Sequence, residues 1–138
     1  MSTIKDKKEK SKEEKIRELE FLFTSFLKKD VKFREDPVYM AIFEAINRLD
    51  YGSFLPFDIE KDIRLHNPKV IEILKKDSDS DSVIGKSIGS RLKQLVLRSI
   101  LKVLNEKPEI RRQKTFAVDE EIKENLKEYI KIIINEKK

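Results

Sequence analysis

The sequence predicts a single domain that is mainly α with a small β-hairpin, an α+β fold. The chain has 138 residues, which suits one domain, and 38% of them are hydrophobic. Between residues 16 and 99, apolar side chains recur mostly at spacings of three and four, as on one face of a helix. After residue 99 the period changes, and two short extended runs flank Pro108. The long helical stretch and the late change of period together predict the class.

The first part of the chain divides into a charged tail and a helix. Residues 1–15 are almost wholly polar and of mixed charge, so we expect a disordered tail. We expect an N-terminal helical segment over residues 16–36, closed by Phe33 and the Asp36-Pro37 pair. The apolar positions of this segment are Ile16, Leu19, Leu22, Phe23, Phe26 and Leu27.

The next helix is predicted from Pro37 to about Leu49, because Asp36 suits the N-cap and proline suits the first helical turn. Its expected buried positions are Tyr39 or Met40, Ile42, Phe43, Ile46 and Leu49. Residues 50–52 then form a turn, and residues 53–57 a short extended piece. Pro56 excludes that piece from the centre of a sheet.

Two further helical segments follow, over residues 58–66 and 68–76. Asp58 is the expected cap of the first, which carries Ile59, Ile63 and Leu65, and Asn67-Pro68 begins the second.

The stretch "DSDSDSVIGKSIGSRLKQL", residues 77–95, is open to three interpretations. A calcium loop needs a glycine and a glutamate where Ser82 and Ile88 stand, although Asp77, Asp79 and Asp81 fit the earlier ligand positions. A phosphate-binding loop is excluded because "GKS" supplies only the end of its motif. An amphipathic helix over residues 83–99 remains.

The apolar residues of this helix fall within an arc of about 120°. They are Ile84, Ile88, Leu92, Leu95 and Val96. Gly85 and Gly89 lie at the edge of the arc, where we expect another helix to pack closely.

The last third of the chain predicts a hairpin and a helix. Strands are expected over residues 100–106 and 113–118, joined by a polar turn over residues 107–112. Asp119 then caps a C-terminal helix over residues 119–138. The apolar stripe of this helix consists of Ile122, Leu126, Tyr129, Ile130 and Ile133.

Positive charge is concentrated in one quarter of the chain. The whole chain carries +5, whereas residues 82–115 alone carry +7. Such a concentration is typical of a nucleic-acid binder. The polar face of helix 83–99 has donors and acceptors that suit base edges and phosphates. The alternative is an ordinary solvated face, which every amphipathic helix possesses.

The order of these elements over residues 37–135 resembles the winged helix-turn-helix DNA-binding domain family. "SVIGKSIGSRLKQLVLRSILKVL" is similar to a recognition helix that runs into the wing, and "EIRRQKTFAVDEE" to a wing tip, its returning strand and the next helix. The resemblance implies a winged-helix domain over residues 37–118 with extra N-terminal and C-terminal helices. The chain departs from the family at Ser99, where glycine is usual, and at "NPKVIEILKKDSDSDS", where the family has a short turn. It stays open whether residues 58–66 or 68–76 form the second helix of the motif.

The resemblance also implies which residues contact DNA. The residues expected in the major groove are Lys86, Ser87, Ser90, Arg91, Lys93 and Gln94. The wing residues expected at phosphates or in the minor groove are Lys107, Arg111, Arg112 and Lys114. The implied function is sequence-selective binding of double-stranded DNA, by a transcriptional regulator or nucleoid-associated factor. The alternative is a winged-helix protein–protein interaction module in a replication, transcription or other assembly.

Other kinds of function have little support in the sequence. Without cysteine there is no thiolate zinc site, and His66 is the only histidine. The carboxylates occur as caps and surface charges, so we expect no enzyme, no cofactor and no small-molecule ligand. No apolar run approaches the ~20 residues of a membrane span, and no secretory signal is evident. We therefore expect a cytoplasmic, nucleoid-associated protein without a membrane partner.

A homodimer is expected from two surplus apolar features. They are the aromatic residues Phe21, Phe23 and Phe26, and the pair Ile132 and Ile134. An intramolecular core would account for the same residues. The chain also holds 17 isoleucines and 23 lysines. That bias is typical of proteins from thermophiles and also of AT-rich genomes.

Overall fold

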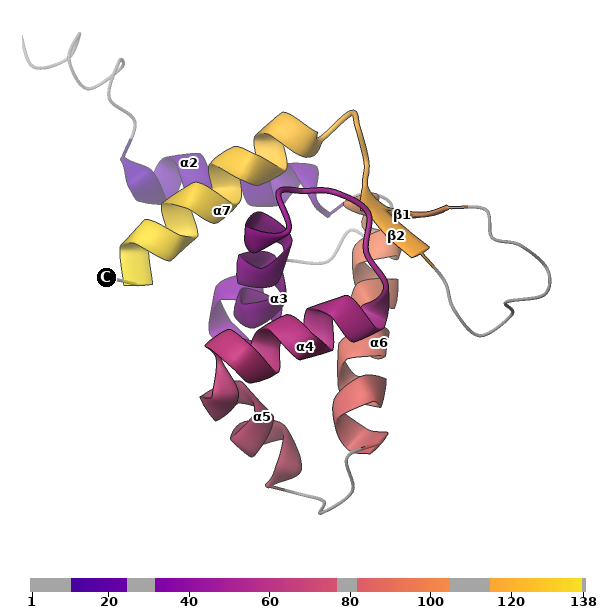
Figure 1. Ribbon diagram of the computed structural model, residues 1–138. Helices are drawn as coiled ribbons and strands as arrows, with labels where there is room; N and C mark the ends of the chain where they lie inside the picture. Colours follow the sequence, from indigo (N-terminus) through magenta and orange to yellow (C-terminus); the bar gives the residue numbers. More distant parts are fainter. Residues whose placement is uncertain (1–10, 25–31, 77–81, 105–114, 138) are drawn as a thin grey trace, which may run out of the picture.

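The computed structural model describes residues 11–24, 32–76, 82–104 and 115–137. These residues form six α-helices, one short 3-10 helix (η2, Phe33–Glu35) and two strands (Figure 1). The predicted class, mainly α with a small antiparallel hairpin, is confirmed. No helix in the described ranges is long and apolar enough to cross a bilayer.

Helix α2 spans Lys12–Leu22 and so begins inside the segment that we expected to be disordered. The cause is local: the hydroxyl of Ser11 accepts a hydrogen bond from the backbone N–H of Glu14, at 3.1 Å. This S-x-x-E spacing is a known signature of a helix start. The prediction of a disordered tail is therefore wrong for residues 12–15. The helix ends at Leu22, and Phe26 and Leu27 lie outside the described residues.

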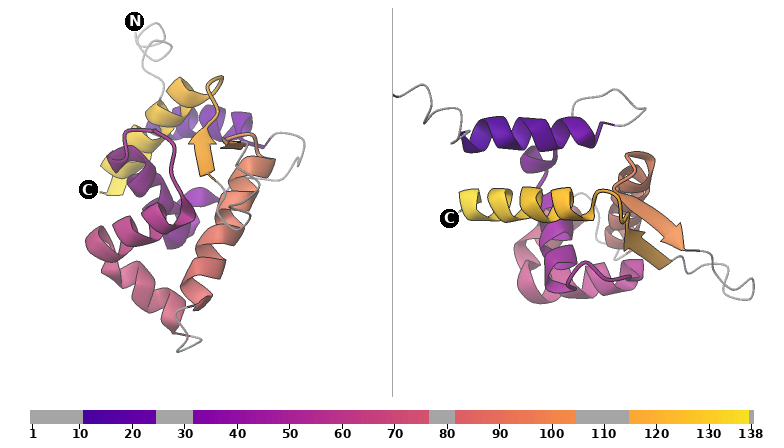
Figure 2. Two further views of the ribbon diagram at one scale, coloured as in Figure 1. Left: turned by 45° about the vertical axis from the view of Figure 1, so that its right-hand side comes forward. Right: turned by 90° about the horizontal axis from the view of Figure 1, so that it is seen from above.

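Helix α2 lies beside the C-terminal helix α7, Lys123–Lys137, and the two run in opposite directions (Figure 2). The rings of Phe23 and Tyr129 meet edge to face, 5.2 Å apart, and the Tyr129 hydroxyl donates to Glu20 at 2.7 Å. Ile132 and Ile134 pack against the same core. Intramolecular packing thus accounts for most of the apolar surplus in these two helices. Phe21 and Leu22 remain 76% and 49% exposed.

Helix α3, Pro37–Arg48, lies between this pair and the other helices. Asp36 caps it as predicted, since its carboxylate accepts from the backbone N–H of Val38 at 2.9 Å. Ile42, Phe43 and Ile46 are fully buried. Of the two residues left open, Met40 is buried and Tyr39 is half-buried.

The remaining helices are α4 (Pro56–His66), α5 (Pro68–Lys75) and α6 (Ser82–Leu97). Helix α4 packs against α3, α5 and α6. It begins two residues before Asp58, whose carboxylate accepts from the backbone N–H of Leu55 at 2.9 Å. Ile59 and Ile63 are fully buried, one helical turn apart.

The sheet consists of β1, Leu101–Leu104, and β2, Thr115–Val118, paired antiparallel with Val103 opposite Phe116. Strand β1 begins one residue later than predicted, and the predicted extensions of the two strands over residues 105–106 and 113–114 lie outside the described residues. Within the described residues, the extended piece before α4 pairs with the sheet at Phe54. Phe54 and Phe116 exchange two backbone hydrogen bonds of 2.8 Å, and their rings stack 6.1 Å apart. Pro56 starts α4 directly afterwards, so the pairing cannot continue.

Two helices end on a non-glycine residue with left-handed backbone. Ser99 has φ 62° after α6, and Asp50 has φ 55° after α3. After α6 the N–H of Ile100 bonds to the carbonyl of Leu95 and that of Ser99 to Val96, which is the Schellman pattern. Ser99 therefore adopts the conformation for which glycine is usual.

Candidate nucleic-acid interface

Helix α6 has one buried face and one exposed polar face. The predicted apolar stripe is confirmed: Ile84, Ile88, Leu92 and Leu95 are at most 1% exposed. Four of the six residues expected at the major groove are exposed together on the opposite face, namely Lys86, Ser90, Lys93 and Gln94. No acidic residue occurs anywhere in α6. This face therefore presents two cations, a hydroxyl and an amide to solvent.

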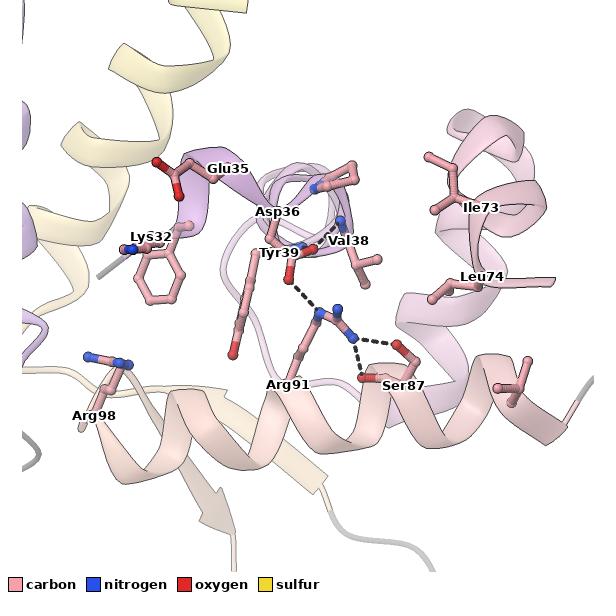
Figure 3. A pocket seen from close by; sticks show the side chains of 13 residues that line it. Lys32, Glu35, Asp36, Val38, Tyr39, Ile73, Leu74, Ser87, Arg91 and Arg98 are labelled. Atoms are coloured by element: carbon pink, nitrogen blue, oxygen red, sulfur yellow. Dashed lines mark hydrogen bonds and ion pairs between the residues drawn. The ribbon is translucent and has the colours of Figure 1, made fainter. Parts of the chain in front are cut away.

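The other two residues of the expected set, Ser87 and Arg91, lie on a different side of α6. The Arg91 Nε atom is 3.0 Å from Asp36 Oδ2, and the guanidinium also donates to the Ser87 carbonyl at 3.2 Å and to its hydroxyl (Figure 3). The guanidinium carbon lies 5.5 Å from the centre of the Tyr39 ring. Arg91 thus joins α6 to the start of α3 and does not share the exposed face.

The helical repeat explains the position of Arg91. It follows Ile84 by seven residues, which is close to two full turns, so it projects near the buried face. At 25% side-chain exposure it is a border residue whose long chain reaches a partner on α3. The seven-residue spacing from Ile84 to Arg91 can be read from the sequence. The identity of the partner residue on α3 cannot.

A groove of about 680 Å³ surrounds this contact, between the start of α3, the end of α5 and α6 (Figure 3). A second arginine, Arg98, also holds elements together here. It donates to the Phe23 carbonyl at 3.3 Å and lies 5.9 Å from the centre of the Phe33 ring. Burial raises the pKa of Tyr39 above its ordinary value. Arg91 therefore joins α6 to Asp36 at the start of α3, and Arg98 joins the end of α6 to Phe23 and Phe33.

The hairpin adds one described cation to the surface. Lys102 of β1 is exposed and belongs to the basic segment of residues 82–115, but it is not among the residues that the resemblance predicts to contact DNA. The expected wing residues Lys107, Arg111, Arg112 and Lys114 lie outside the described residues. Leu104 and Thr115, which are paired in the sheet, mark where that connection leaves and returns.

A second groove, of about 420 Å³, lies beside the polar face of α6. It is lined by residues from α4, α6 and both strands: Pro56, Gly89, Lys93, Val96, Leu97, Val103 and Phe116. Val103 is 43% exposed. The groove cannot be recognised from the sequence, because no local pattern connects α4, α6 and the two strands.

The glycines of α6 are not explained by packing within the described part of the chain. A Cβ atom at Gly89 would meet nothing within 4 Å, and one at Gly85 would come no closer than 3.7 Å to Glu60. The prediction that another helix packs closely is therefore wrong for Gly89, whereas at Gly85 the neighbour at ordinary contact distance belongs to α4, which packs on α6.

Other candidate chemistry is sparse in the residues that the structure describes. Within these ranges no three His, Asp or Glu side chains gather where they could hold a metal ion. His66 is exposed as the last residue of α4. Gly85, Lys86 and Ser87 lie inside α6, so the "GKS" letters belong to a helix and not to a loop.

Comparison with known proteins leaves the family open. No protein-family model matches the sequence, and neither a search of curated proteins nor a search of solved structures finds a match.

Proposed function

We propose that the protein binds double-stranded DNA with some sequence selectivity, as a winged-helix transcriptional regulator or nucleoid-associated factor. The observation that carries the proposal is the exposed face of α6, which presents Lys86, Ser90, Lys93 and Gln94 without an acidic residue. Because the major groove admits one α-helix, such a face brings its side chains to base edges and phosphates at once.

The residues of this face take different roles in the proposal. Lys86 and Lys93 follow one another by seven residues and so lie on one side of α6, where both reach phosphates. Gln94 pairs with an adenine through its amide, a contact worth about 1–3 kcal/mol of discrimination. The four wing cations add phosphate or minor-groove contacts. The excess charge of residues 82–115, +7, supports this distribution.

The order of elements supports the winged-helix architecture. Helix α3, the Phe54 bridge, α4, α6 and the β1–β2 hairpin follow one another as in that family. We assign α4 as the second helix of the motif, because Ile59 and Ile63 are fully buried where α4 packs on both α3 and α6. Helix α5 is then an insertion before the recognition helix.

A salt titration with charge-matched variants tests the proposal. The double variant Lys86→Ala, Lys93→Ala removes two cations from the α6 face, and Lys12→Ala, Lys131→Ala removes two exposed cations from α2 and α7. Each phosphate contact contributes about 0.9 to the slope of log affinity against log salt. We expect the first variant to lose up to about two units of slope on a random-sequence duplex. The control variant keeps the wild-type slope. Equal slopes for both variants would contradict the placement of DNA on α6.

A specific observation favours a second candidate, the protein–protein interaction module. Phe57 and Leu65 of α4 are 65% and 74% exposed, and Phe57 follows Pro56 at the rim of the apolar groove. Contiguous patches of exposed apolar side chains are typical of interaction surfaces, and Phe57 extends the apolar groove in this way. The same titration separates the candidates, since an interaction module binds no duplex even at low salt.

A homodimer is also proposed, on narrower grounds than the sequence indicated. Phe23 is buried in the core and Ile132 and Ile134 pack against it, so the dimer contact rests on Phe21 and Leu22. Sedimentation of wild type and Phe21→Glu tests it: we expect a dimer that the substitution dissociates. A wild-type protein that stays monomeric at high concentration would contradict the proposed homodimer.

A further inference from the structure

The groove beside the polar face of α6 is apolar except for one cation. Of the seven described residues that line it, six are glycine, proline or apolar, and the seventh is Lys93. Val103 and Phe116 face each other across the two strands and form one wall. Among the described residues the groove has one cation, Lys93, and no acidic side chain, so an occupant that combines an apolar group with negative charge complements it.

Gly89 keeps the groove open on the helix side. A Cβ atom there would meet nothing within 4 Å, so the space above this residue is free of neighbours among the described residues. A glycine inside a helix destabilises the folded state relative to alanine. Packing among the described residues does not explain why a glycine occupies this position. Close approach of an external group to the helix would explain it.

DNA offers an occupant with the required chemistry. The C5-methyl group of thymine is the apolar group of the major groove, and phosphates flank it on both strands. A helix that places Lys86 and Lys93 on phosphates brings its Gly89 side close to base edges. An acidic peptide with an apolar side chain also combines these properties. The adjacent row of hydroxyl, amide and ammonium groups favours the base edge, because these are the groups that read it.

We infer that this groove receives thymine C5-methyl groups, so that the protein prefers thymine to other pyrimidines lacking the methyl group. This inference rests on the proposed function and adds a source of selectivity to it. Burial of one methyl group contributes about 0.8 kcal/mol, which is about a fourfold change in Kd.

The test compares duplexes that differ only in the methyl group. Wild-type protein is titrated with an alternating dA–dT duplex and with the same duplex containing deoxyuridine in place of thymidine. We expect binding to the deoxyuridine duplex to be weaker by about fourfold for each methyl group bound. In a second pair, replacing cytosine by 5-methylcytosine in an alternating inosine–cytosine duplex strengthens binding, because it adds a methyl group at the same ring position.

Two glycine variants show whether the groove is responsible. Gly89→Leu fills it, and we expect the ratio of the two affinities to fall to about one while the melting temperature is not lowered. Gly85→Leu is the matched control, since Gly85 does not line the groove, and it keeps the wild-type ratio. A wild-type ratio of one, or a ratio unchanged in Gly89→Leu, overturns the inference and leaves the proposed function standing. Failure to bind any of the duplexes at low salt removes the proposed function itself and leaves the acidic-peptide occupant.

Discussion

Arg91 and Asp36 connect the middle of α6 to the residue that caps α3, with 3.0 Å between the Arg91 Nε and the Asp36 Oδ2 atoms. The same carboxylate accepts a hydrogen bond from the backbone N–H of Val38, at 2.9 Å. The Asp36 side chain therefore caps the N-terminus of α3. Through Arg91 it also orients α6, the helix that we propose to read DNA. Both partners are about three-quarters shielded from solvent, at 25% and 28% side-chain exposure.

We predict that Arg91→Ala lowers the free energy of unfolding by about 1–3 kcal/mol, because it leaves part-buried charged and polar groups without a partner. Urea denaturation measures this loss. Lys93→Ala is the control, since exposed substitutions usually stay within about 0.5 kcal/mol. With the folded fraction kept near one, Arg91→Ala binds duplex DNA nearly as wild type. A variant of wild-type stability that has lost DNA binding would place Arg91 at the DNA after all.

Ser99→Gly is expected to stabilise the protein by about 1 kcal/mol, because an L-residue with left-handed backbone is strained by about that amount or more. The matched control is Ser90→Gly, the same exchange at an exposed position inside α6, where the added backbone freedom destabilises by about 0.5–1 kcal/mol. Thermal unfolding of the two variants should therefore shift in opposite directions. Two shifts of the same sign would show that the φ of 62° does not govern the turn after α6.

Alkaline pH is expected to destabilise the fold through Tyr51. Burial, with a smaller contribution from the charge of Asp50, raises the pKa of Tyr51 to about 12 from an ordinary value of 10.0. Since the folded pKa is the higher one, the stabilising contribution is complete below pH 10 and is lost as pH rises toward 12. The urea midpoint of wild type should fall over this window more than that of Tyr51→Phe. Tyrosinate absorbance, as a difference between the two proteins, reports the pKa directly, and ionisation near pH 10 would refute this environment.

Substitutions in α6 and in the basic connection should affect DNA binding differently. Gln94→Ala is expected to weaken a site selected from random duplexes more than it weakens random duplex, because base contacts carry discrimination. Arg111→Ala with Arg112→Ala should weaken both DNAs about equally and reduce the salt slope by up to about two units. Mobility-shift titrations of both DNAs measure, for each variant, the ratio of its affinity for the selected site to its affinity for random duplex. Loss of selected-site binding alone in the arginine variant would make that connection the reading element.

Local signals in the sequence determined the helices and much of the core. The Asp36-Pro37 and Asn67-Pro68 pairs mark the starts of α3 and α5, and the repeat of Ile84, Ile88, Leu92 and Leu95 defines the buried face of α6. These signals depend on caps and on helical period, which act within one or two turns. The start of α2 was equally local, in Ser11 and Glu14, and it was overlooked among the surrounding charges.

The tertiary structure decided which contacts are made by residues at the borders of the buried helix faces. Arg91 belongs to the α3 contact because its partner, Asp36, stands 55 residues away in the chain. The apolar groove exists because Pro56, Gly89 and Val103 come from three segments that only packing brings together. Helical period places a residue near the edge of a face, but the element packed opposite determines whether its side chain finds a partner or solvent. That element is set by long-range contacts, which no local pattern contains.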